Sequence, residues 1–234
     1  MALSSDYRLL AAGSRDGSVL VWNMEVFEML HTLPGHSAEA CDILDTSARV
    51  RCLETAEQNR LLFTGLGSGT VLVFPLNSRQ DVACTPPPES QKPVNDMAIN
   101  KQEKQLAIAH NDSVLVVDII PADPCAVIDG PAYTFKAQIP GSLISRVAVL
   151  ADYRVLYGLT SGDSFLYICP RDQVFPLEGH RSQFSCSESS HGERRALSGS
   201  EDSLQHLWAL EFFRCAIRRH YSSKRVSIVD YRLP

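Results

Sequence analysis

A strand–turn–strand pattern recurs five times along the 234-residue chain, and this repetition restricts the possible folds more than any other feature. Each copy has an apolar run, a short polar turn and a second apolar run that ends in a bulky residue. The copies are LLAAGSRDGSVLVW (residues 9–22), LLFTGLGSGTVLVF (61–74), LAIAHNDSVLVV (106–117), VLYGLTSGDSFLYI (155–168) and ALSGSEDSLQHLW (196–208). Their last residues lie 40–52 positions apart, which is the period of repeated structural units.

The turns and the flanking sequences predict four strands in each unit. The turns hold Gly, Asp, Asn or Ser, which accept positive φ or bond their own backbone, as tight hairpins require. One more strand is expected before most copies, at 50–53, 94–99, 145–150 and 184–187, and another after each, at 28–32, 81–84, 125–128, 173–176 and 213–217. A four-stranded unit is the blade of a β-propeller, and no long 3.6-residue apolar period predicts helix. We therefore predict an all-β propeller at 1–217, with blades near 3–33, 49–85, 94–129, 144–177 and 184–217.

Several residues in these copies resemble the WD-repeat family. Gly35-His36 and Gly179-His180 stand where that family has its GH dipeptide, and Trp22 and Trp208 stand where it has the Trp of WD. The resemblance implies a WD40-type propeller in which a histidine and backbone N–H groups satisfy a turn aspartate. It implies such a structural hydrogen-bonding set for His180, Ser198, Asp202 and Trp208, and in the earlier copies for Asp16, Trp22, His36 and Thr64.

The chain also departs from the family pattern. Asn23 and Ala209 stand where the family usually has Asp, and the second copy has Ser68 and Phe74 in place of the turn Asp and the Trp. The third and fourth copies lack both GH and Trp. The segment 176–208 is similar to the WD-repeat halves of NACHT-and-WD-repeat proteins, which are signalling NTPases whose propellers sense or dock partners. This chain has no G-x-x-x-x-G-K-[ST], so the resemblance implies the propeller portion without the NTPase part.

Closure of the ring is open to two interpretations. An open arc exposes two apolar blade faces and forfeits on the order of 10 kcal/mol per face. No inner strand is expected before Leu9, whereas VSIVDY at 226–231 predicts an additional strand. That strand could complete the first blade of a five-bladed ring. Alternatively, the chain is a truncated form that associates through open blade edges. The basic segment before Val226 does not resemble a blade, which favours the second interpretation.

Motifs for catalysis, metal binding and membrane insertion are missing. There is no H-E-x-x-H and no G-x-S-x-G, and the Gly65–Gly69 segment opens no helix that could bind phosphate. The seven cysteines include no C-x-x-C pair, and no apolar run is long enough to cross a bilayer. We expect no enzyme activity, no catalytic residues, no metal, no cofactor and no membrane partner, in a cytoplasmic protein for which the nucleus is the alternative.

The expected function is that of a protein-interaction scaffold or sensor in intracellular signalling or complex assembly. In a propeller, the turns between the second and third strands share one exposed rim with the loops that enter the inner strands. The predicted partner-binding rim residues are Arg15, Glu39, His110, Arg181, Gln183 and Glu201, and the arginines are the expected anchors.

The formal net charge of −5 gives no reason to expect nucleic acid as the main partner. Residues 214–225 nevertheless hold five Lys or Arg and no Asp or Glu. The basic C-terminal segment 218–234 is therefore interpreted as a solvated tail, with a nucleic-acid-associated adaptor or a nuclear-import signal as the alternative.

Overall fold

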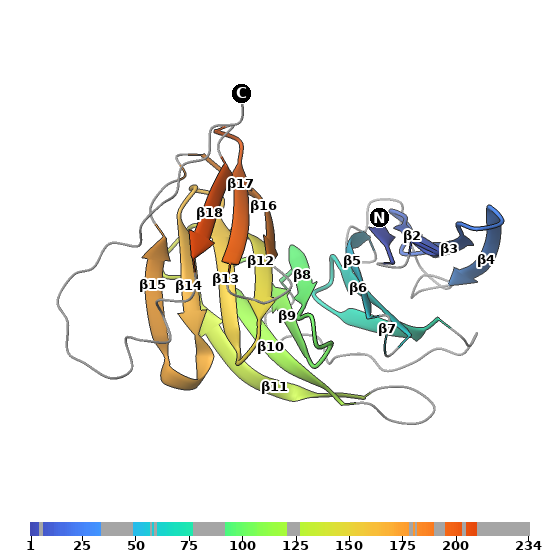
Figure 1. The fold of residues 1–234 in the computed structure, drawn as a ribbon, viewed down its shortest axis with the longest axis horizontal. Helices are drawn as coiled ribbons and strands as arrows, with labels where there is room; N and C mark the ends of the chain where they lie inside the picture. The colour runs from blue at the N-terminus through green and yellow to red at the C-terminus, as the bar shows by residue number, and fades with distance from the viewer. Residues whose placement is uncertain are drawn as a thin grey trace.

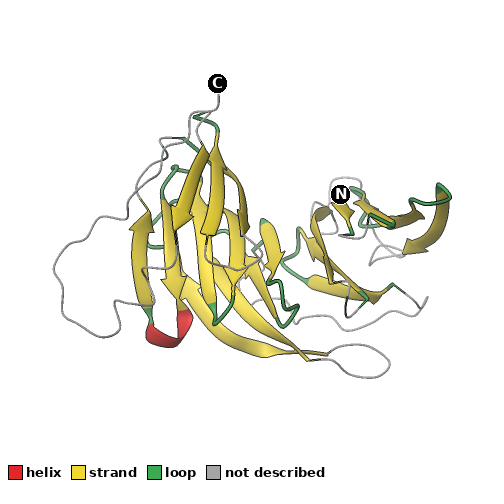
Figure 2. Cartoon of the chain, in the orientation of Figure 1, coloured by secondary structure: helices red, strands yellow, loops and turns green. Residues whose placement is uncertain are grey.

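The computed structural model describes residues 1–4, 7–33, 49–76 without 57 and 59, 92–120, 127–177, 180, 182–189, 195–202 and 205–209. These residues form five antiparallel β-sheets that follow one another along the chain (Figures 1 and 2). The one helical segment among them is a 3-10 turn at Cys169–Arg171. The prediction of an all-β propeller is confirmed, and the ring that these sheets begin is not closed.

Every sheet is a meander in which consecutive strands pair. The first contains β1 (Ala2–Leu3), β2 (Leu9–Gly13), β3 (Val19–Asn23) and β4 (Glu28–Leu33), and the second contains β5 (Val50–Ala56), β6 (Leu61–Leu66) and β7 (Val71–Pro75). The third contains β8 (Asp96–Ile99), β9 (Gln105–Ala109), β10 (Ser113–Ile120) and β11 (Val127–Lys136). The fourth contains β12 (Ile144–Leu150), β13 (Arg154–Leu159), β14 (Ser164–Ile168) and β15 (Gln173–Leu177), and the fifth contains β16 (Phe184–Ser189), β17 (Arg195–Ser200) and β18 (Gln205–Ala209).

Two strands differ from the sequence-based expectation. A short strand, β1, pairs with β2 through Ala2↔Ala11, so an inner strand does precede Leu9. The fourth strand of the third sheet was expected at 125–128, within a blade ending near 129, but β11 runs on to Lys136. It can continue through Pro131 because this residue lies on an edge strand, at a register irregularity, where the missing N–H breaks no regular ladder. The strands expected at 81–84, 213–217 and 226–231 lie outside the described residues.

The core lies between the sheets, because strand alternation gives each inner sheet two apolar faces. In the second sheet, Leu62, Leu72 and Phe74 pack against the first sheet, while Leu61, Phe63 and Val71 pack against the third. All six side chains are at most 4% exposed. The sheets therefore stack side by side like blades.

Backbone hydrogen bonds join each sheet to the next at one end of the strands. The N–H groups of Val50 and Val94 donate to the carbonyls of Ser14 and Leu66, both at 3.1 Å, and Ile144 N donates to Asn111 O at 2.7 Å. In each case, the residue that enters an inner strand is bonded to a hairpin turn of the preceding sheet. A Cβ at Gly13 would lie 2.2 Å from Val50 Cγ1, so this close approach requires glycine.

Candidate functional site: the arginine-bearing rim

The rim is formed by the turns between the second and third strands of the sheets and by the residues that precede or begin each inner strand. Within a sheet, these two parts are tied by the hydrogen bonds Gly67 N→Arg49 O at 2.9 Å, Thr160 N→Leu143 O at 2.8 Å and Glu201 N→Gln183 O at 3.0 Å. The bonds between sheets described above lie at the same end of the strands. The rim backbone is therefore held both within each sheet and between neighbouring sheets.

Four arginine side chains on this rim are exposed, and they come from three sheets: Arg15, Arg49, Arg51 and Arg146. Arg15 and Arg49 lie in neighbouring segments, because the residues beside them, Ser14 and Val50, share a backbone hydrogen bond. Arg51 and Arg146 stand at β-bulges near the entry of β5 and β12. A bulge redirects side chains, which is consistent with the exposure of these two arginines on otherwise packed inner strands.

Asn95 connects three sheets beneath the arginines. Its amide nitrogen donates to Asn111 Oδ1 at 3.1 Å and to the Ile144 carbonyl at 2.9 Å. Its amide oxygen accepts a hydrogen bond from Arg51 Nη2 at 3.2 Å. This side chain thereby positions Arg51 against the third and fourth sheets.

His110 is buried, with 1% exposure, which corrects the expectation that it lies on the exposed rim. Its Nδ1 lies 3.0 Å from the carbonyl oxygen of Lys92, so the ring turns inward under the loop that enters β8. Burial lowers the pKa of this imidazole below its ordinary value. The more accessible polar groups at this corner are instead the half-buried ion pair Lys92–Asp112, at 2.5 Å.

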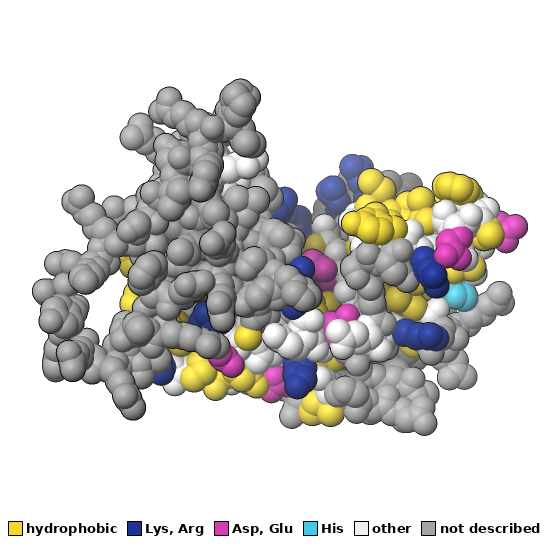
Figure 3. Space-filling view, in the orientation of Figure 1, with side chains coloured by type: hydrophobic (Ala, Val, Ile, Leu, Met, Phe, Trp, Pro, Cys, Tyr) yellow, Lys and Arg dark blue, Asp and Glu magenta, His cyan; other side chains and the backbone are white. Residues whose placement is uncertain are grey.

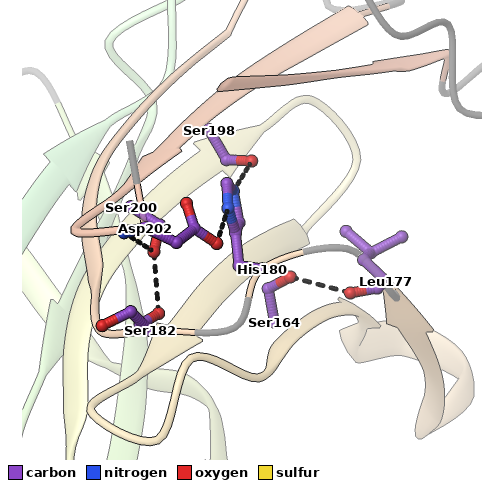
Figure 4. A network of polar contacts seen from close by, with 7 residues as sticks. All are labelled: Ser164, Leu177, His180, Ser182, Ser198, Ser200 and Asp202. Carbon is purple, nitrogen blue, oxygen red and sulfur yellow. Dashed lines mark hydrogen bonds and ion pairs between the residues drawn. The ribbon is translucent and has the colours of Figure 1, made fainter. Parts of the chain in front are cut away.

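Figure 4 shows the polar network of the last repeat, which the structure brings together around His180. His180 Nε2 lies 2.8 Å from Ser198 Oγ, and its Nδ1 lies 3.5 Å from Asp202 Oδ2. The His180 side chain is fully buried, and Ser198 is buried as well. Trp208 lies on β18, opposite Ala196. The arrangement places a turn carboxylate beside a buried imidazole at ion-pair distance, which agrees with the structural set that the family resemblance implies.

Ser200 links this turn to the loop before β16. Its hydroxyl donates to the Ser182 carbonyl at 2.8 Å and accepts from Asp202 N at 3.3 Å (Figure 4). Gly162, in the corresponding turn of the fourth sheet, has a φ of +98°, and a Cβ there would lie 2.6 Å from Ser182 O. The turn of the fourth sheet therefore approaches the loop that enters the fifth sheet so closely that position 162 has no room for a side chain.

The first repeat uses its turn aspartate differently from the family-based expectation. Asp16 is exposed, and its Oδ1 accepts hydrogen bonds from Ser18 N at 2.9 Å and Ser18 Oγ at 2.6 Å. These bonds lower the pKa of the Asp16 carboxyl. Trp22 is half-buried on β3, opposite Leu10. In the second repeat Thr64 is fully buried at the strand position that Ser198 occupies in the fifth, and its expected partner His36 lies outside the described residues.

Asp96 lies on β8 just below the rim and joins the third sheet to the fourth. Its Oδ2 accepts a hydrogen bond from the backbone N–H of Val147 at 2.9 Å. Burial raises the pKa of this carboxyl to about 6, although the Val147 hydrogen bond and the Arg146 charge act in the opposite direction. Burial also raises the pKa of the neighbouring Cys52 thiol, which disfavours the reactive thiolate.

Of the other predicted rim residues, Gln183 and Glu201 are exposed and adjacent, while Glu39 and Arg181 lie outside the described residues. The sequence prediction missed four rim residues: Arg49, Arg51, Asn95 and Arg146. The three arginines each lie within two residues of the start of a predicted inner strand, and this signal could have identified them.

Within the described ranges, no group of three His, Cys, Asp or Glu side chains is arranged to hold a metal ion, and no helix could span a membrane.

Comparisons with known proteins agree with this architecture. The family model "WD domain, G-beta repeat" matches residues 1–23. The β-propeller domain of Myceliophteria thermophila Cps50 (Swd1) superimposes with a TM-score of 0.71 at 16% identity, over 97% of this chain and 69% of that one. The chain has the fold of the WD-repeat β-propellers, and its first residues match a WD repeat. The WD40 repeats of RRP9 give a TM-score of 0.70 at 18% identity, over 90% of this WD-repeat chain and 59% of that one.

This WD-repeat chain is also similar in sequence to two much longer proteins. It is 58% identical to mouse, and 57% identical to human, NACHT domain- and WD repeat-containing protein 1, in each case over 185 residues and 79% of the chain. The chain spans 12% of the length of these relatives, so the similarity concerns a WD-repeat portion of them. WD-repeat propellers are generally non-catalytic modules that bind other proteins.

Proposed function

We propose that this WD-repeat chain is a non-catalytic scaffold or sensor module that binds partner proteins through the arginine-bearing rim. The observation that carries the proposal is the combination of a fixed backbone and exposed cationic side chains. Hydrogen bonds within and between sheets hold the rim, while Arg15, Arg49, Arg51 and Arg146 remain accessible. A pre-ordered surface loses less conformational entropy when a partner binds.

The chemistry of the rim favours an acidic segment of a partner protein. The chain as a whole carries a formal charge of −5, yet these four rim positions are all cationic. Arginine binds carboxylates through two parallel hydrogen bonds and is a frequent energetic anchor of interfaces. Asp16 and Glu201 are also exposed on this rim, in the first and fifth sheets.

We place this activity in the cytoplasm, in a signalling or assembly complex. The relative NACHT domain- and WD repeat-containing protein 1 joins WD repeats to a NACHT domain, and in such a protein the WD repeats would be the docking part. A nucleic-acid contact by residues 214–225 stays a prediction. If these residues do contact nucleic acid, the affinity for nucleic acid should fall steeply as the salt concentration is raised.

The test is affinity capture from cytosolic extract with the charge-reversed variant Arg15→Glu/Arg49→Glu. Loss of two anchors should reduce retention of the partner by at least about tenfold, because one anchor commonly contributes 2 kcal/mol or more. The matched control is Arg171→Glu, an exposed arginine in the turn after β14, at the opposite ends of the strands. Unchanged capture by the double variant, or an equal loss in the control, would contradict the proposal.

A further inference from the structure

Two turns of the first sheet, at the end of the strands opposite the rim, expose apolar side chains. The turn before β2 holds Tyr7, which is 72% exposed, and the turn between β3 and β4 holds Val26 and Phe27, which are 58% and 79% exposed. The two turns lie side by side, because Met24 N donates to Arg8 O at 2.7 Å. Hydrophobic side chains gather over this part of the molecule (Figure 3). We call Tyr7, Val26 and Phe27 the turn patch.

The equivalent turn of the fourth sheet is charged instead of apolar. The turns between β3 and β4 and between β14 and β15 are equally long, and the last residue of each has a positive φ, +56° at Phe27 and +51° at Asp172. Arg171 and Asp172 therefore correspond to Val26 and Phe27. Both are exposed although the fourth sheet is covered on its two faces, whereas one face of the first sheet has no described neighbour. Exposure at these positions thus belongs to the turn and does not depend on a neighbouring sheet.

Tyr7 has its own equivalent, Glu103, in the turn before β9. Both residues donate their N–H to the backbone carbonyl three positions earlier, at 2.9 Å, and both have a positive φ, +60° at Tyr7 and +52° at Glu103. This backbone conformation is unfavourable for a bulky side chain, and an exposed ring gains nothing from burial. Neither the turns nor the core accounts for the aromatic rings of Tyr7 and Phe27, which points to a contact with another molecule.

The charges around the turn patch indicate the chemistry of its ligand. Arg8 Nε and Glu25 Oε1 form an ion pair at 3.1 Å between the two turns, so these two charges offset each other. Glu28 follows Phe27 at the start of β4 and is exposed, and no described residue forms an ion pair with it. A carboxylate beside an exposed ring favours a cationic group, which can bond the carboxylate and lie over the ring. It disfavours a lipid surface, in which the carboxylate would lose its water.

We propose that the turn patch binds a segment of a partner protein that carries apolar side chains together with Lys or Arg. The apolar side chains cover Tyr7, Val26 and Phe27, and a cation of the segment binds Glu28. This surface lies at the other end of the strands from the rim, and its ligand is basic rather than acidic. The inference therefore goes beyond the function proposed above and does not depend on it.

Fluorescence anisotropy with three labelled heptapeptides tests the proposal. The full chain should bind Gly-Leu-Arg-Leu-Arg-Leu-Gly at least tenfold more tightly than the acidic Gly-Leu-Glu-Leu-Glu-Leu-Gly or the polar Gly-Ser-Arg-Ser-Arg-Ser-Gly. The variant Val26→Arg/Phe27→Asp gives the first sheet the turn residues of the fourth and should weaken binding of the first peptide at least tenfold. Its melting temperature should not fall, because Asp accepts a positive φ more readily than Phe.

Glu28→Lys is a second variant, and it should invert the preference between the basic and the acidic peptide. Ile120→Ser is the matched control, because Ile120 is 46% exposed at the end of β10, outside the turn patch, and its replacement should leave binding unchanged. Equal binding of the three peptides, or equal affinity of the double variant and the wild type, would overturn the proposal. Cosedimentation of the wild type, but not of the double variant, with phosphatidylcholine vesicles would assign the patch to lipid and overturn it as well.

Discussion

At the scale of single residues, Asp96 shows how one half-buried side chain couples two sheets. Its carboxylate accepts the Val147 N–H across the junction of the third and fourth sheets, and burial raises its pKa to about 6. The folded protein therefore binds this proton more tightly than the unfolded chain, in which the carboxyl titrates near 4. This contribution to stability is complete below about pH 4 and is lost as the pH rises through 6.

Replacing Asp96 by Asn should raise stability at pH 7.5 and remove this part of the pH dependence. The amide oxygen can still accept the Val147 hydrogen bond, and the burial of a charge is avoided. A shift of about two pKa units corresponds to roughly 2–3 kcal/mol, of which we expect about half to appear. Urea unfolding of both proteins at pH 5 and pH 7.5 measures the difference. Parallel pH profiles, or a less stable Asn variant at pH 7.5, would contradict the assignment.

Residue-scale features divide into those that the sequence predicts and those that it does not. The set around His180 was expected from family resemblance, and the structure places His180, Ser198 and Asp202 in contact. Asn95 carried no local signal, because its partners Arg51 and Ile144 lie 44 and 49 residues away along the chain. His110 was misplaced because a polar residue after a strand suggests exposure, whereas the Lys92 carbonyl holds it inside.

At the scale of elements, the sequence pattern predicts the hairpins well because a tight turn and strand alternation are both local. Elements whose ends depend on distant partners were predicted less well. The short β1 is a strand only because β2 pairs with it, and β11 continues past Pro131 because the long β10 supplies its register. Bulges at the entry of the inner strands likewise depend on pairing with the next strand of the same sheet and leave no local signature.

The hydrogen bond between His180 and Ser198 should hold the last hairpin to the loop before it. Ser198→Ala leaves the buried imidazole without this hydroxyl and should lower the free energy of unfolding by about 1–3 kcal/mol. A double-mutant cycle with His180→Ala should give a coupling energy of about 0.5–2 kcal/mol. Ser18→Ala, which removes a hydroxyl bonded to the exposed Asp16, should change stability by less than about 0.5 kcal/mol. Additive effects of the two substitutions at 180 and 198 would show that the contact contributes little.

At the scale of the whole molecule, stability depends on each sheet covering its neighbour. Both faces of the second, third and fourth sheets are buried, and the first sheet keeps one open face. The backbone bonds that cross from sheet to sheet also build the rim, so the same contacts support the fold and the proposed binding surface. The five repeats predicted this serial arrangement, whereas the open face becomes visible only when the burial of equivalent residues is compared.

Residue-resolved hydrogen exchange of the backbone amides of Val50, Val94 and Ile144 tests this account most directly. These N–H groups donate to the preceding sheet at Ser14, Leu66 and Asn111. If the sheets form one propeller arc, the three amides should be protected as strongly as amides inside the strands and should open together with them. Rapid exchange of all three, while the strand amides stay protected, would mean that the sheets fold as separate units and would contradict the account.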